Sequence, residues 1–245
     1  MERERGAIVV ALPSVMGDVR AAIRDAGTLY GAAAVQPAAR AFAGRGRAYH
    51  MMTADGAVVV RHYLRGGAAA RVLTDEYARV GTARPLRELE ASVAARACGV
   101  ATPEVVASVV YPAGAVYRAD IATRYIALST HLADVTLSEQ RLDAQTRFEA
   151  WRAAGNLLRS AFDAGVHHAD LNMRNILIRV AEDGAVGALL LDLDRAVVRP
   201  HAVRTDARRA MLDRLHRSRR KLEQAAAYAT PPSELDAFNA ALRGK

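Results

Sequence analysis

Several absences limit what this chain can be. Its 245 residues include a single cysteine, Cys98, which excludes an internal disulfide framework and a zinc site built from cysteines. No run of about 18 apolar residues occurs, so the sequence predicts no membrane-spanning helix. The N-terminal segment lacks the apolar core of a signal peptide. These absences predict a cytoplasmic protein in a reducing compartment.

Lysine and aromatic residues are also scarce. The only lysines are Lys221 and Lys245, so a phosphate contact made earlier in the chain must use arginine. Aromatic residues make up 5% of the chain and are not interleaved with basic residues. Proteins that bind single-stranded nucleic acid combine a basic groove with aromatic side chains. The sequence therefore predicts no nucleic-acid partner.

Positive charge is abundant, with a formal net charge of +8. Such an excess favours anionic partners, including a phospholipid surface or an acidic small molecule. Much of it lies in a C-terminal stretch with the basic residues Arg208, Arg209, Arg214, Arg217, Arg219, Arg220 and Lys221. The apolar residues Met211, Leu212, Leu215 and Leu222 recur there at helical spacing. Two interpretations stay open: an amphipathic helix that lies on an anionic membrane surface, or a helix with a solvated charged face.

The predicted elements form a β-rich first half with one helix, then a helical second half containing a short hairpin. The predicted strands of the first half are 48–53, 58–63, 105–111 and 115–126, and residues 7–12 form a short apolar run. Its helix is 85–97, and a short helical segment is expected at 18–26. The second half has a helix at 147–164, strands 176–180 and 189–194, and a long basic helix from Thr205. The length suits one domain, or two small lobes that share a cleft.

One motif carries chemistry: His168-x-Asp170-Leu171-x-x-x-Asn175, followed by an apolar strand and then Asp192. Phosphoryl transfer needs a carboxylate that takes the proton of the acceptor hydroxyl, and oxygen ligands that hold Mg²⁺ against the triphosphate. This spacing supplies both, with Asp170 as the base and Asn175 and Asp192 as metal ligands. Asp194 competes with Asp192 for the metal. His168 either holds the loop by hydrogen bonding or takes part in proton transfer, and we place it with the catalytic residues.

Nucleotide contacts are predicted in the first half. Gly44-Arg-Gly46 is a candidate phosphate-covering loop, because missing side chains let backbone N–H groups approach phosphates. Kinases hold the phosphates with a lysine on the next strand, and here Arg61 occupies that place. Its expected glutamate partner on the following helix is Glu88 or Glu90. Helical periodicity favours Glu90 and the spacing to Gly99 favours Glu88, and we predict Glu88.

These motifs resemble those of the Kdo (3-deoxy-manno-octulosonic acid) kinases of the lipopolysaccharide kinase family. Besides the Asp170 loop, the stretches that carry the resemblance are Gly44-Arg-Gly46, Val60-Arg61-His62-Tyr63-x-Arg65-Gly66-Gly67, Tyr117-Arg118-Ala119-Asp120, Asp192-Leu-Asp194-Arg195 and Leu215-x-Arg217-Ser218. The resemblance covers roughly residues 40–222. Leu193 stands where that family usually shows an aromatic residue, a departure expected to alter packing more than chemistry.

The resemblance implies an α+β, bilobal, protein-kinase-like fold, with an N-lobe at 1–126 and a C-lobe at 127–245. It further implies an enzyme that uses ATP and Mg²⁺ to phosphorylate a sugar hydroxyl of a lipid-linked acidic saccharide, namely Kdo on a lipid A precursor. Such a substrate would bring the protein to the inner face of the cytoplasmic membrane. Two alternatives stay open: another acceptor (a heptose, an aminoglycoside or a protein serine or threonine), or a pseudokinase or basic binding module. Asn172 replaces a lysine of many protein kinases, which counts against a protein substrate.

Overall fold

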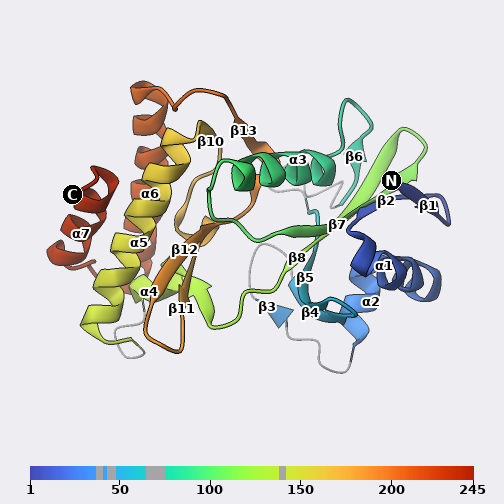
Figure 1. Ribbon diagram of the computed structural model, residues 1–245, viewed down its shortest axis with the longest axis horizontal. Coiled ribbons are helices and arrows are strands. Elements are labelled where there is room, and N and C mark those ends of the chain that lie inside the picture. Colours follow the sequence, from blue (N-terminus) through green and yellow to red (C-terminus); the bar gives the residue numbers. More distant parts are fainter. Residues whose placement is uncertain (37–40, 43–47, 65–74, 138–141) are drawn as a thin grey trace. The chain divides into compact units, whose positions relative to one another are not determined.

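The computed structural model describes residues 1–36, 41–42, 48–64, 75–137 and 142–245. The chain forms two compact units (Figure 1). The N-terminal unit comprises Met1–Glu90 and Glu104–Tyr125, and the C-terminal unit comprises Ala91–Pro103 and Ile126–Lys245. The chain passes from the N-terminal to the C-terminal unit for the last time between Tyr125 and Ile126, one residue from the lobe boundary predicted between residues 126 and 127. The segment 91–103 differs from the prediction, because it groups with the C-terminal unit.

An antiparallel sheet forms the N-terminal unit, with the strand order β1-β2-β7-β8-β5-β4-β3 and β6 paired to β8. Its strands are β1 (Glu2–Glu4), β2 (Ala7–Ala11), β3 (Ala41–Phe42), β4 (Ala48–Thr53), β5 (Gly56–His62), β6 (Tyr77–Ala78), β7 (Val105–Ala113) and β8 (Val116–Arg124). The predicted Asp55-Gly56 turn joins β4 to β5, where Thr53 pairs with Gly56. Gly56 has φ +97°, a conformation that favours glycine.

Helices cover both faces of this sheet. On one face, α1 (Pro13–Ala26) and α2 (Leu29–Val35) bury Val15, Ile23 and Leu29 against the sheet residues Val9, Val60 and Val109. On the other face, Leu86 and Leu89 of α3 (Arg84–Ala97) pack on Tyr63, Tyr117 and Ile121. The alternation of side chains along β5 therefore places His62 on the first face and Arg61 on the second.

The prediction of one helix in the first half was wrong. Helix α1 begins at Pro13, five residues before the segment expected at 18–26, with a proline in its first turn. Helix α2 is short and rich in alanine, so its sequence has little amphipathic contrast. Its start is held by Thr28, whose Oγ1 accepts a 2.9 Å hydrogen bond from the Gly31 N–H.

The C-terminal unit is built around the long helix α5, which is covered by other helices and two small sheets. Its helices are α4 (Leu132–Leu137), α5 (Ala144–Asp163), α6 (Thr205–Ala226) and α7 (Pro232–Leu242). The sheets have the orders β12-β11-β9 and β10-β13, with β9 (Ser129–His131), β10 (Val166–His168), β11 (Ile176–Val180), β12 (Val186–Leu190) and β13 (Ala196–Val198). Figure 1 shows β11 and β12 as a hairpin beside α5.

The core of this unit follows the predicted apolar face of α5. Trp151, Leu158 and Phe162 are buried there, and Trp151 meets Phe238 of α7 edge-on with ring centroids 5.8 Å apart. Gly155 permits this approach, because a Cβ at that position would collide with the backbone of α7 at Phe238. Among the residues that the structure describes, no helix has the length and hydropathy needed to cross a membrane.

Candidate active site

The predicted catalytic loop lies between β10 and β11. β10 ends at His168, a turn carries Asp170, and a short 3-10 helix at Met173–Asn175 leads into β11. The Asp170 residue is exposed, while Leu171 and Met173 on either side of Asn172 are buried. Alternating burial thus fixes the loop on the core of the C-terminal unit and leaves the Asp170 carboxylate toward solvent.

His168 connects this loop to the segment that precedes Asp192. The residue is buried, its Nε2 lies 2.9 Å from the Leu191 carbonyl oxygen, and its Nδ1 accepts a 3.3 Å hydrogen bond from the Asp170 N–H. Both contacts are satisfied together when Nε2 carries the proton and Nδ1 does not. With both ring nitrogens bound to backbone groups, the His168 side chain is a positioning group in this geometry.

Asn175 holds the other side of the loop. Its Nδ2 donates a 2.9 Å hydrogen bond to the Asp170 carbonyl oxygen, as does the Nδ2 of Asn172. The Asn175 carbonyl oxygen also accepts a 2.9 Å hydrogen bond from the Leu191 N–H. Because the amide nitrogen of Asn175 faces the loop, its amide oxygen is directed away from that contact and is the atom able to serve a cation.

Asp192 follows Leu191 directly, so these two backbone contacts place it next to the loop. It has φ +60° and ψ +61°, a left-handed conformation that costs a non-glycine residue about 1–2 kcal/mol. Residues held in such conformations concentrate at functional sites, where surrounding contacts maintain them. Asp194, the competing carboxylate, is buried with 5% of its surface exposed, whereas Asp192 is half-buried.

Helix α6 also holds the loop, through two contacts that the sequence did not predict. The His168 N–H lies 3.2 Å from the Met211 sulfur, and the Met173 N–H donates a 3.3 Å hydrogen bond to the Ser218 hydroxyl. Met211 and Ser218 are seven residues apart, so they share one face of α6. That spacing was visible in the sequence, but nothing in it indicated which loop the face would meet.

The ion pair expected in the N-terminal unit is formed by Arg61 and Glu88. Arg61 Nη2 lies 2.6 Å from Glu88 Oε1, and the Tyr63 hydroxyl donates a hydrogen bond to Glu88 Oε2. Glu88 is 3% exposed, while Glu90 is exposed to solvent. The structure therefore selects Glu88 as the partner of Arg61. Whether Arg61 contacts a nucleotide stays a prediction.

On the opposite face of β5, His62 belongs to a polar network that the sequence did not predict. His62 Nδ1 lies 2.6 Å from Asp120 Oδ1, and Nε2 lies 3.3 Å from Asp75 Oδ2. The fully buried Asp120 also accepts hydrogen bonds from the Tyr111 hydroxyl (2.7 Å) and the Tyr30 N–H (2.9 Å) at the start of α2. Burial lowers the pKa of His62, but the two carboxylates outweigh it and leave that pKa above its ordinary value of 6.5. Burial and the Asp120 charge raise the pKa of the Tyr111 hydroxyl, which stays a donor.

Two further points concern the predicted ligand contacts. Gly44 and Gly46, the candidate phosphate-covering loop, lie outside the described residues and stay a prediction. In the part of the chain that the structure describes, no three His, Cys, Asp or Glu side chains cluster in a way that could hold a metal ion. The predicted metal ligands are one carboxylate and one amide, so the rest of such a shell would come from nucleotide and water oxygens.

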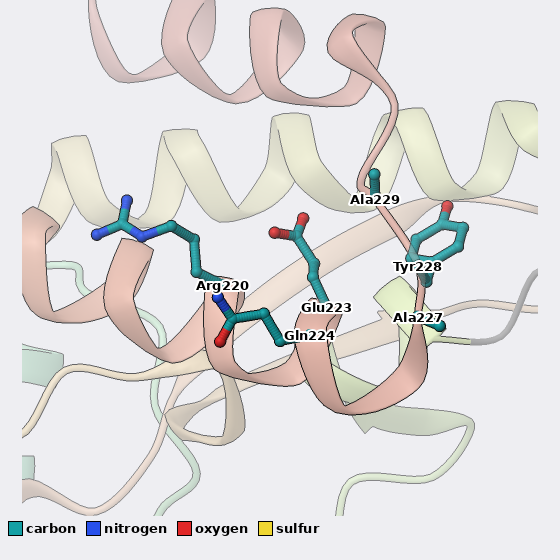
Figure 2. Close-up of a pocket in the computed structure, with 6 residues that line it drawn as sticks. All are labelled: Arg220, Glu223, Gln224, Ala227, Tyr228 and Ala229. Atoms are coloured by element: carbon teal, nitrogen blue, oxygen red, sulfur yellow. The ribbon is translucent and has the colours of Figure 1, made fainter.

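A shallow pocket at the C-terminal end of α6 is distinct from this site. Figure 2 shows Arg220, Glu223 and Gln224 on the last turns of α6, and Tyr228 and Ala229 on the segment that leaves it. Glu223 is already bound there, since its Oε1 accepts hydrogen bonds from the Thr230 hydroxyl and N–H. None of the predicted site residues lines this pocket.

The geometry can be compared with known proteins. Residues 35–231 match the model of the Lipopolysaccharide kinase (Kdo/WaaP) family. The 3-deoxy-D-manno-octulosonic acid kinase of Stenotrophomonas maltophilia (strain K279a) is 37% identical over 181 residues, which are 73% of this chain and 68% of that protein. The kinase of the same name from Xanthomonas axonopodis pv. citri (strain 306) is 36% identical over 180 residues, with the same coverage of both chains.

A solved structure shows the same fold. The structure titled "WaaP in complex with acyl carrier protein" matches with a TM-score of 0.58 and 17% identity, and covers 97% of this chain and 89% of that one. It supports the predicted kinase-like α+β architecture. From the family model and the curated relatives together, the chain belongs to the lipopolysaccharide kinase (Kdo/WaaP) family.

Proposed function

We propose that this chain transfers the γ-phosphoryl group of ATP to a hydroxyl of a 3-deoxy-D-manno-octulosonic acid residue on a lipid A precursor. The observation that carries the proposal is the Asp170 loop, where backbone contacts through His168 and Asn175 bring a carboxylate, an amide and Asp192 together. The relatives named above are kinases of this sugar acid, and the loop supplies the groups that such a transfer requires.

Asp170 acts as the general base. Its backbone oxygen and N–H are held by Asn172, Asn175 and His168, which leaves the exposed carboxylate to bind the acceptor hydroxyl. The carboxylate orients that hydroxyl and accepts its proton as the phosphorus–oxygen bond forms. His168 links the backbone of Asp170 to that of Leu191 through its two ring nitrogens and does not itself exchange a proton.

Asn175 and Asp192 would hold Mg²⁺ together with the nucleotide. Magnesium prefers oxygen ligands and usually keeps several waters, which suits a site with one carboxylate and one amide oxygen. The bound ion would neutralise charge that develops on the phosphates. The orientation of the Asn175 amide, fixed by its hydrogen bond to the Asp170 carbonyl, fits this role.

Arg61 is the phosphate-binding cation of the N-terminal unit. A guanidinium stays charged at every relevant pH and offers paired donors to phosphate oxygens. Arg61 Nη2 contacts Glu88, which orients the guanidinium, and about a third of the side chain is exposed. Gly44 and Gly46 complete the proposed phosphate contacts with backbone N–H groups.

The exposed basic residues of α6 bring the protein to an anionic membrane surface at the cytoplasmic side. Arg217 and Arg220 are exposed, but Arg219 is not available, since its Nη1 lies 2.5 Å from Glu223 and only 15% of its side chain is exposed. Binding to anionic vesicles should weaken as salt rises, because such charges are screened over about 8 Å at physiological ionic strength. Replacing Arg217 and Arg220 by glutamine should weaken it further without changing ATP affinity. Equal vesicle binding by this variant and the wild type would leave α6 as a solvated helix.

Mass spectrometry of the acceptor tests the activity directly. A Kdo-bearing lipid A precursor incubated with the protein and Mg-ATP should gain the mass of one phosphate group, and fragmentation should place it on the Kdo residue. The Asp170→Asn variant is the matched control and should give no gain. A phosphate gain on a heptose or an aminoglycoside instead of Kdo would contradict the proposed acceptor, while ATP binding without transfer to any of them would indicate a pseudokinase.

A further inference from the structure

A second cavity of the C-terminal unit is lined by arginine and histidine side chains that the proposed mechanism does not use. It measures about 230 Å³ and is lined by residues of the β10–β13 ribbon, of the segment that follows β13 and of the start of α6. The polar side chains that line it are His167, Arg199, His201 and Arg204. The remaining lining residues are small or apolar, and none of the lining residues is acidic.

The cavity lies on the opposite face of the ribbon from the His168 ring. His167 pairs with Val197 across the ribbon, and both line the cavity. Successive strand residues point to opposite faces, so His167 faces away from the side on which His168 contacts Leu191. Asp170 is nevertheless only three residues from His167, which corresponds to at most about 11 Å of extended chain.

The charge of the cavity is positive and only partly compensated. Arg204 forms an ion pair with Asp206 at 3.2 Å, and both side chains are largely exposed. Within the described part of the chain, Arg199 forms no ion pair with a carboxylate. The two histidines add N–H donors, whereas Asp206 in the first turn of α6 offsets the positive end of that helix. An anion entering the cavity would therefore meet donors from three different segments.

Backbone contacts hold the cavity in shape. The Arg199 N–H donates to the Gly165 carbonyl (3.1 Å), and the Val203 N–H donates to the Phe162 carbonyl (2.7 Å). Gly165 lies so close to this segment that a Cβ would collide with the carbonyl oxygens of Arg199 and His201. Arg208 adds a 2.7 Å hydrogen bond to the Val203 carbonyl. The backbone that carries the donors is thus fixed before any ligand arrives, which lowers the entropic cost of binding.

We propose that this cavity binds an oxyanion group, a carboxylate or a phosphate, of the saccharide acceptor. Its volume is several times the roughly 30 Å³ of one water molecule, yet below the range of whole-ligand pockets, so it suits one functional group of a larger molecule. The acceptor named under the proposed function is a sugar acid on a lipid precursor, large enough to reach both the cavity and Asp170. The identity of the ligand rests on the proposed function, whereas the anion binding rests on the cavity alone.

The first experiment tests anion binding without substrate. Inorganic phosphate is titrated into the full chain at constant ionic strength, and the imidazole resonances of His167 and His201 are followed by NMR. We expect saturable shifts of both histidines in the wild type and in Arg179→Gln, a control at an exposed arginine outside the cavity. Arg199→Gln should weaken phosphate binding about tenfold or more, as loss of a charge-assisted hydrogen bond implies. Absent shifts, or equal affinity in Arg199→Gln and wild type, would overturn the proposal.

The second experiment identifies the source of the anion. With the Kdo-bearing acceptor, Arg199→Gln should raise the acceptor KM about tenfold or more while kcat and the KM for ATP stay unchanged, the pattern of lost uniform binding. Arg199→Lys should restore part of the affinity, and circular dichroism should show that both variants are folded. An unchanged acceptor KM would restrict the site to free phosphate and refute the acceptor assignment. If the wild type phosphorylates no Kdo acceptor while phosphate still shifts the histidines, the proposed function fails and only anion binding stands.

Discussion

Glu88→Gln removes the negative charge that holds Arg61 and keeps nearly the same side-chain volume. In the native protein the carboxylate accepts hydrogen bonds from Arg61 and Tyr63, and it is 3% exposed. Removing one partner of a fully buried pair costs about 3–5 kcal/mol, because the other charge is left without compensation. Here about a third of the Arg61 side chain is exposed, so water can solvate the released guanidinium, and the glutamine carbonyl can still accept one bond. We therefore expect a loss of about 2 kcal/mol, near the value of one charge-assisted hydrogen bond.

The measurement pairs stability with nucleotide affinity. Urea unfolding followed by circular dichroism should show a lower midpoint for Glu88→Gln than for Glu90→Gln, the control at an exposed position two residues away on α3. Surface substitutions of the latter kind usually change stability by less than about 0.5 kcal/mol. Titration with ATP should show weaker binding in Glu88→Gln alone, because Arg61 loses the contact that orients it. Indistinguishable variants in both assays would refute the role of this ion pair.

The remaining predictions concern the Asp170 loop and the His62 network. Asp170→Asn should lower kcat by about two to four decades while the melting temperature and ATP affinity stay near wild type; an unchanged rate would remove Asp170 as the base. Asp192→Ala should abolish the Mg²⁺ dependence of ATP binding, measured by calorimetry with and without the metal, and the same effect from Asp194→Ala instead would reverse the choice of ligand. The raised pKa of His62 means that its protonated form stabilises the fold below about pH 6.5 and that this contribution is lost as pH rises through the folded-state pKa. The unfolding free energy of His62→Gln should therefore depend less on pH above 6.5 than that of wild type, and parallel pH profiles would contradict the network.

Local sequence order explains which parts of the site were predictable. His168, Asp170 and Asn175 lie within eight residues, and the hydrogen bonds among them depend on loop geometry that the spacing already implies. Arg61 and Glu88 are 27 residues apart, and their pairing followed from an expected strand and helix. In that pair the periodicity argument favoured the exposed Glu90, since a buried carboxylate paired with arginine interrupts the apolar stripe that periodicity relies on.

The network around Asp120 could not be predicted in the same way. Its members His62, Tyr111 and Tyr30 come from β5, β7 and α2, and they meet only once the strand order is set. Each residue taken alone reads as an ordinary polar position in a strand or helix. The stretch with Asp120 contributed to the family resemblance, but only the fold shows that this carboxylate joins α2 to the sheet. Alanine-rich α2 was missed because its sequence has little amphipathic contrast, although alanine itself favours a helix.

Three side chains of the loop bind Asp170, the proposed base, through its backbone groups. The Asp170 N–H binds His168, and its carbonyl oxygen binds two asparagine amides, so these three contacts leave its carboxylate unused. His168 has the opposite arrangement, with both ring nitrogens engaged in positioning. Replacing the Asp170 carboxylate is therefore expected to lower activity without changing the conformation of the loop. Replacing His168 removes the hydrogen bonds that position the loop and is expected to change its conformation. The Asp170 carboxylate can therefore contact an acceptor without disturbing the contacts that keep Asp192 and Asn175 in place.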